Sequence, residues 1–88
     1  MEVVPGLYQH FKVNRYRVLG ILRHSETLEE LVLYRALYHS TEYGAHAEWV
    51  RPLAMWQSTV SRDGYSGPRF RLTSKDGPFH CTDCGAAL

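Results

Sequence analysis

Two apolar segments on either side of a short polar loop constrain the fold more than any other feature of the sequence. Residues 15–24 combine arginines with apolar side chains, and residues 31–38 begin with a continuous run of leucine, valine and tyrosine. β-Branched and aromatic residues of this kind favour strands. Folding the two segments about Ser25–Glu30 places Leu22 opposite Leu33, and apolar cross-strand pairs of this kind stabilise a sheet. The sequence therefore predicts an antiparallel hairpin.

A helix is the alternative for the second segment. Thr27-x-x-Glu30 has the form of a helix capping box, and an apolar run at helical spacing follows it. The strand is favoured because the first segment needs a partner and because the pairing is consistent along its length. The same register pairs Val18 with Leu37, Ile21 with Tyr34, Arg17 with Tyr38 and Arg35 with Gly20.

Apolar residues on both faces of the first segment indicate a strand that is covered on both sides or strongly bent. Gly20 lies at its middle, where a strand glycine often marks such a bend. The sequence thus predicts a mainly β fold, a small β-barrel or roll. Its other expected elements are strands at residues 6–11, 48–51 and 69–72, a tight turn at Lys12-Val13-Asn14, a single helical or 3₁₀ turn at residues 53–56, and loops at residues 39–48 and 57–68.

The length of 88 residues predicts one domain, residues 1–72, followed by a flexible tail, residues 73–88. This tail has few apolar anchors and is expected to be dispensable for folding. The net charge of +1 argues against a nucleic-acid partner. Neither a membrane-spanning run nor a signal-peptide pattern is found, so we expect a soluble, cytoplasmic protein.

Six ordered blocks of the sequence resemble the small bacterial domain-of-unknown-function family 1653. The resemblance covers about residues 5–71 and rests on Gly6-x-Tyr8-x-His10-Phe11-Lys12, Tyr16-x-Val18, His24-Ser25-Glu26-Thr27-x-Glu29, Val32-x-Tyr34-Arg35-Ala36-Leu37-Tyr38, Trp49-Val50-Arg51-Pro52-x-x-Met55 and Arg69-Phe70. It implies a compact, SH3-like β-barrel and carries no known activity, substrate or catalytic residue. Val13 departs from the family, which usually has glycine there, and the tail after Leu72 lies outside the shared region.

The polar loop between the two hairpin strands is the predicted site. It contributes His24, Ser25, Glu26 and Thr27, and neighbouring elements could add His10, Trp49 and Arg51. Mixed aromatic, histidine and arginine side chains suit a small planar or anionic ligand, or a short peptide. The leading hypothesis is therefore a small binding module centred on residues 24–29, in which His24, Glu26 and Arg51 converge.

Other interpretations of these residues stay open. Ser25, Glu26 and Thr27 could only satisfy the backbone of the turn, Trp49 could fill the core, and Arg51 could pair with Glu26 or Glu29. A small enzyme would use His24 or Glu26 as acid–base, but a nucleophilic triad is disfavoured because adjacent residues of an extended segment point to opposite sides. A third alternative is an interaction domain without a ligand pocket, such as a homodimer formed through a sheet edge.

The two cysteines, Cys81-x-x-Cys84, precede Gly85 and form half of a zinc knuckle. A structural zinc site needs four ligands, and no second pair accompanies them in the sequence. His80, Cys81 and Cys84 are therefore weak metal candidates, and no cofactor is predicted. Three interpretations are left: an empty tail, a zinc site completed by a distant histidine or another chain, and a redox pair.

Overall fold

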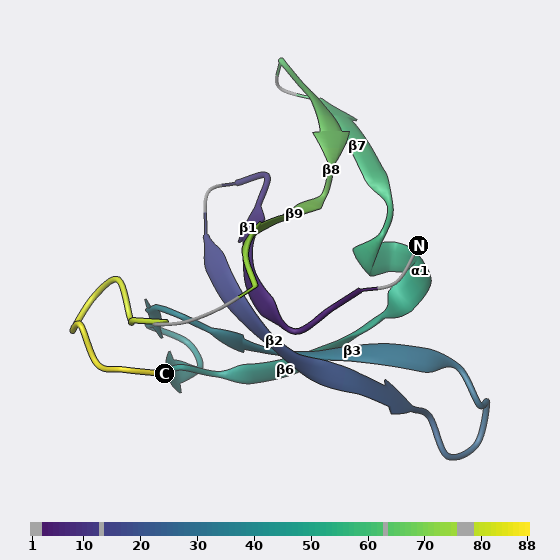
Figure 1. Ribbon diagram of the computed structural model, residues 1–88, viewed down its shortest axis with the longest axis horizontal. Helices are drawn as coiled ribbons and strands as arrows, with labels where there is room; N and C mark the ends of the chain where they lie inside the picture. Colours follow the sequence, from purple (N-terminus) through teal and green to yellow (C-terminus); the bar gives the residue numbers. More distant parts are fainter. Residues whose placement is uncertain (1–2, 13, 63, 76–78) are drawn as a thin grey trace.

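A five-stranded antiparallel sheet organises the computed structural model, which describes residues 3–12, 14–62, 64–75 and 79–88 (Figure 1). The strand order is β6-β3-β2-β1-β9. Its members are β1 (Gly6–His10), β2 (Arg15–Arg23), β3 (Glu30–Ala36), β6 (Glu48–Pro52) and β9 (Phe70–Ser74). The prediction for Val13 lies outside the described residues. No helix in the described part of the chain is long and apolar enough to cross a membrane.

The hairpin of β2 and β3 is confirmed, but the predicted register is wrong. Leu22 lies opposite Leu31 rather than Leu33, and Ile21 lies opposite Val32. The loop is tighter than expected because Arg23 already pairs with Glu30, while the amide of His24 donates to the carbonyl of Glu29. The observed pairing of β2 with β3 has a register shift between Val18 and Gly20, where the central glycine predicted a bend.

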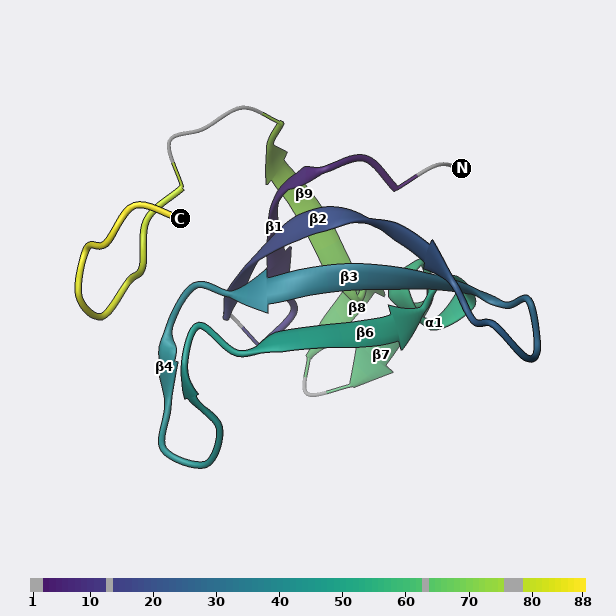
Figure 2. The same ribbon diagram turned by 90° about the horizontal axis from the view of Figure 1, so that it is seen from below.

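The sheet bends strongly but does not close, so the predicted barrel is wrong in this respect. Among the described strands, β6 and β9 are the two edges and are not hydrogen-bonded to each other. The bend nevertheless brings their side chains together, because the guanidinium of Arg51 in β6 lies 5.2 Å from the ring centroid of Phe70 in β9. Figure 2 shows the sheet curling in this way, with β9 crossing behind β2 and β3.

An aromatic core fills the concave side of the sheet. The predicted helical turn is confirmed as α1 (Leu53–Trp56), and it inserts Trp56 against Phe70 with stacked rings 3.7 Å apart. Trp56 also contacts Tyr34 at 4.9 Å and Tyr8 at 5.4 Å. Val18 and Val32 complete the buried cluster. The turn therefore places Trp56 in the core on the open side of the sheet.

Both segments predicted as loops contain short hairpins. β4 (His39–Ser40) pairs with β5 (Gly44–Ala45), and β7 (Thr59–Arg62) pairs with β8 (Tyr65–Pro68). These strands are only two to four residues long and carry mostly polar residues. They leave no apolar periodicity from which a strand could be predicted.

The C-terminal segment, residues 79–88, is packed against the sheet, contrary to the expected unanchored tail. The amide and hydroxyl of Thr82 donate to the carbonyl of Leu37 at 2.8 and 3.1 Å, and the carboxylate of Asp83 accepts from the amide of His39 at 2.6 Å. Arg17 donates to the carbonyl of Leu88 and lies over the ring of Phe79 at 4.7 Å. Polar contacts, one arginine–aromatic contact and the buried side chain of Cys81 hold this segment. Because large apolar side chains contribute little, a search for apolar anchors missed it.

Candidate functional site

A cavity of about 370 Å³ lies where β2, β3, β6 and the β4–β5 hairpin meet. Aromatic side chains and polar side chains share its wall. It is lined by Tyr16, Tyr34, Tyr38, Tyr43 and Trp49, by Ser40, Glu42 and Arg51, and by the small residues Ala36 and Ala47.

Two sets of perpendicular rings shape this cavity. Tyr16 meets Tyr34 edge to face at 5.2 Å and Tyr38 at 5.6 Å, and the hydroxyls of Tyr16 and Tyr38 are hydrogen-bonded at 2.9 Å. Burial, together with the hydrogen bond to Tyr38, raises the pKa of Tyr16 well above its ordinary value. Tyr43 and Trp49 form the second set, at 4.7 Å and 88°. Ring faces and phenol hydroxyls therefore form one part of the cavity wall, beside the carboxylate of Glu42 and the guanidinium of Arg51.

Arg51 places a positively charged guanidinium in the wall of this cavity. It lies opposite Val32 in the β3–β6 ladder, and its side chain is half-buried. Within the described residues it forms no ion pair with a carboxylate, so the alternative that paired it with Glu26 or Glu29 is not observed there. The ion pair that is present joins Arg35 to Glu48, whose carboxylate accepts from Nε at 2.9 Å.

The loop predicted to form the site lies apart from this cavity. Residues 24–29 are exposed, and their side chains bond within the turn. Nδ1 of His24 accepts from the amides of Glu26 and Thr27 at 3.1 and 3.3 Å, and Oγ1 of Thr27 accepts from the amide of Glu29 at 3.2 Å. In the described part of the chain, no hydrogen bond or ion pair joins His24 or Glu26 to Arg51. The structure thus brings Trp49 and Arg51 together but not the loop residues, Ser25 included.

His10 lines a separate and smaller hollow of about 90 Å³ beside Phe11 and Tyr65. Its ring packs on Phe11 at 4.4 Å and on Phe70 at 4.8 Å. Burial, followed by the positive charges of Arg51 and its cationic neighbours, lowers the pKa of His10 to about 4. At neutral pH this histidine is therefore uncharged, and it adds no positive charge to the surface around Arg51.

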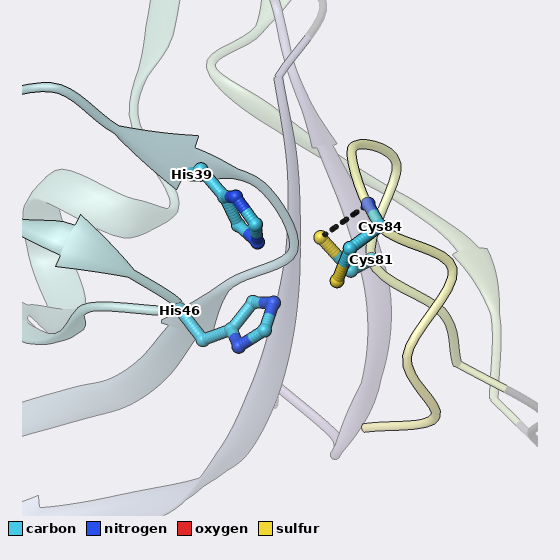
Figure 3. Close-up of side chains that lie close together, drawn as sticks. All are labelled: His39, His46, Cys81 and Cys84. Carbon is cyan, nitrogen blue, oxygen red and sulfur yellow. Dashed lines mark hydrogen bonds between the residues drawn. The ribbon is translucent and has the colours of Figure 1, made fainter.

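A second candidate site brings four metal-binding side chains together at the edge of the sheet (Figure 3). The ligand atoms of His39, His46, Cys81 and Cys84 all lie within 4.8 Å of one another. Burial alone would raise the pKa of Cys81, but the backbone amide of Cys84, the side chain of His46 and the amide of Asp83 outweigh it and lower the pKa to about 6.

Of the residues named as metal candidates from sequence, Cys81 and Cys84 belong to this group and His80 does not. The sequence analysis missed His39 and His46, which lie within the predicted loop at residues 39–48, at the start of β4 and just after β5. The sequence does show two histidines on either side of a turn centred on Gly44. They could not be identified as metal ligands from sequence, because the cysteines reach them only when the C-terminal segment packs against the hairpin.

Comparison with known proteins places this chain among proteins of one family. Residues 6–72 match the family described as "Protein of unknown function (DUF1653)". The crystal structure of a Bordetella bronchiseptica protein of that family superposes with a TM-score of 0.75, at 32% sequence identity, over 88% of this chain and 95% of that one. No curated protein is significantly similar to the chain.

Proposed function

Because this chain belongs to the DUF1653 family, whose description carries no activity, we propose its function from the cavity itself. We propose that the domain is a binding module for a small planar ligand that carries an anionic group. The observation that carries the proposal is Arg51, a half-buried arginine without a carboxylate partner in the described residues, at the wall of a cavity lined by five aromatic rings.

The rings support a planar ligand. Tyrosine and tryptophan faces bind flat groups by stacking, and perpendicular ring pairs offer both faces and edges to one guest. The volume of about 370 Å³ is near the lower end of ligand pockets, which favours one ring system with a substituent over a large cofactor. The exposed ring of Tyr43 stands at the rim, where it can close over a bound group.

Arg51 supports an anionic group on that ligand. A guanidinium presents a planar fork of donors that matches a carboxylate or a phosphate, and its hydrogen bonds to such groups are stronger than neutral ones. Its guanidinium carbon lies 5.2 Å from the ring centroid of Phe70, and none of its donors forms an ion pair with a carboxylate of the described residues. A carboxylate and a phosphate monoester would both bind a guanidinium in this way, and the experiment below distinguishes them.

The proposal moves the site from the loop at residues 24–29 to the cavity. In that loop, His24 and Thr27 already use their acceptor atoms on backbone amides. In the cavity, by contrast, the polar and aromatic groups of four strands converge on one space. Of the seven binding residues predicted from sequence, the proposal keeps Trp49 and Arg51.

The test is a panel of probes in matched charged and neutral forms. Three pairs of probes separate the possible sources of the anion. Benzoate is compared with benzamide for a small carboxylate, and AMP with adenosine for a phosphate. A peptide ending in phenylalanine is compared with its amidated form for a peptide carboxylate. At least one charged probe should raise the melting temperature, and its neutral counterpart should not.

Two variants assign the effect to the cavity. Arg51→Gln should weaken the binding probe at least tenfold, because a hydrogen bond to a charged group contributes about 1.5–3 kcal/mol. Arg15→Gln is the matched control, since Arg15 is exposed at the start of β2 outside the cavity lining, and it should leave binding unchanged. Equal binding of charged and neutral probes, or equal loss in both variants, would contradict the proposal.

A further inference from the structure

The β4–β5 hairpin positions two histidines at one end. His39 begins β4 opposite Ala45, and His46 follows β5 directly, so the two side chains leave the hairpin beside each other with ring centroids 5.2 Å apart. His46 has a left-handed backbone (φ 56°), a conformation that non-glycine residues adopt only at some energetic cost. Its amide donates to the carbonyl of Tyr38, and its imidazole lies toward the two cysteines (Figure 3).

The cysteines approach from the other side on a tight turn of the C-terminal segment. Cys81 is buried at 3% exposure, and its sulfur accepts from the amides of Asp83 and Cys84 at 3.3 and 3.4 Å. Gly85 closes the turn with a left-handed backbone (φ 76°) and donates its amide to the carbonyl of Cys81. Backbone amides aimed at sulfur favour a thiolate, which is the form that binds metal ions.

One atom of the cluster lacks a partner. Nε2 of His46 is buried, and it neither accepts nor donates a hydrogen bond among the described residues. A buried polar atom without a partner has lost its hydrogen bonds to water and gained none in return, which destabilises the folded chain. A bond from this nitrogen to a metal ion would remove that penalty.

From these four side chains we infer a structural zinc site. His39, His46, Cys81 and Cys84 bind one Zn²⁺ ion that joins the C-terminal segment to the β4–β5 hairpin (Figure 3). Two nitrogens and two sulfurs are a ligand set that zinc prefers in tetrahedral sites. Bonds of about 2.3 Å to sulfur and about 2.0–2.1 Å to nitrogen hold tetrahedral ligands about 3.3–3.8 Å apart. The cluster, whose atoms already lie within 4.8 Å, needs only a small contraction.

Hydrogen bonds made by neighbouring residues hold the four metal-binding side chains together. Thr82 and Asp83, which separate the two cysteines, bond to the carbonyl of Leu37 and the amide of His39. Such neighbouring hydrogen bonds orient metal ligands in structural sites. Four protein ligands leave no open position for a reacting water, so this ion is structural rather than catalytic. Because two thiolates balance the charge of Zn²⁺, the site adds no net charge to the surface.

This inference is independent of the proposed binding function. It concerns the opposite end of the same hairpin, whose Ser40, Glu42 and Tyr43 line the cavity. Zinc would fix the base of the hairpin whether or not the cavity binds a ligand. It also gives a role to a segment beyond Leu72 that the family match does not include.

The experiment measures metal content of the full chain, purified under a reducing atmosphere and reconstituted with Zn²⁺. Elemental analysis should find one zinc ion per chain. Replacement by Co²⁺ should give the visible bands of tetrahedral cobalt together with thiolate-to-cobalt charge transfer in the near ultraviolet. His39→Asn and Cys84→Ser alter exposed residues and should each abolish stoichiometric zinc while circular dichroism reports a folded sheet.

His80→Asn is the matched control, because His80 adjoins Cys81 in sequence but stands outside the cluster, and it should keep the full complement of zinc. Absence of zinc from the reduced wild-type protein after reconstitution would overturn the inference. So would zinc that survives His39→Asn but is lost in His80→Asn. Quantitative formation of a Cys81–Cys84 disulfide in protein purified from a reducing cytosol would support the redox pair instead.

Discussion

The two tryptophans should respond differently to removal, because one forms the core and the other lines the cavity. Trp56 is 2% exposed and stacks on Phe70 at 3.7 Å, whereas Trp49 is half-buried and meets Tyr43 edge to face. Truncating a buried tryptophan to alanine costs about 3–5 kcal/mol. The free energy of unfolding of a natural domain is about 0.05–0.15 kcal/mol per residue, or about 4–13 kcal/mol for 88 residues. Trp56→Ala should therefore remove a large part of the stability.

The unpaired indole of Trp56 lowers that figure. Its Nε1 is buried without a hydrogen-bond partner among the described residues, and removing it relieves a penalty of about 1–3 kcal/mol. We expect a net loss of about 2 kcal/mol for Trp56→Ala. A smaller loss is expected for Trp56→Phe, which keeps a ring on Phe70. Trp49→Ala should cost less, about 1 kcal/mol, the typical size of a single-substitution effect, because its side chain is only partly buried.

Urea unfolding followed by far-ultraviolet circular dichroism measures these differences without depending on tryptophan fluorescence. The slope of the unfolding free energy against urea should stay constant, which keeps the comparison one of stability. Equal losses for the two alanine variants, or a larger loss at Trp49, would show that Trp49 belongs to the core and that the cavity lining has been misassigned.

Three further predictions concern the rest of the fold. Gly6→Ala should destabilise by about 2 kcal/mol or more, because its Cβ would lie 2.6 Å from the carbonyl oxygen of Ser74 at a φ of +151°, while Gly20→Ala meets no atom and should change the urea midpoint little. Stability should fall as the pH drops from 6.5 to about 4, because His10 stays neutral in the folded protein while the unfolded chain binds a proton; a His10→Gln variant with an unchanged pH profile would refute this cause. Deleting residues 79–88 should lower the melting temperature, because their hydrogen bonds to the sheet are lost, and an unchanged melting curve would restore the original interpretation as a dispensable tail.

The strand pattern was predictable from sequence to the extent that apolar periodicity encodes it. β2 and β3 were expected from their composition, and the helical turn at Trp56 from its place after Pro52. The register was not predictable, because it depends on where the loop closes, and here Arg23 already pairs with Glu30. The bend was foreseeable at Gly20, but whether a bent sheet closes into a barrel depends on the pairing of its edges, which no local pattern records.

The candidate sites show a similar division. Trp49 and Arg51 could be named from their residue types, whereas the tyrosines around them resemble ordinary core residues until the sheet bends. The loop at residues 24–29 was polar for a local reason, since His24 and Thr27 satisfy backbone amides of the turn. His39 and Cys81 are far apart in sequence, and only the docking of the C-terminal segment brings them together.

Mapping a bound probe by nuclear magnetic resonance tests the central claim most directly. The charged probe with the largest thermal shift is titrated into labelled protein, and the side-chain signals of Trp49 and Arg51 are followed together with all backbone amides. The account predicts saturable shifts that are largest for the indole of Trp49, the guanidinium of Arg51 and the residues around them in the cavity. Shifts concentrated in residues 24–29, with the signals of Trp49 and Arg51 unchanged, would contradict it and return the site to the hairpin loop.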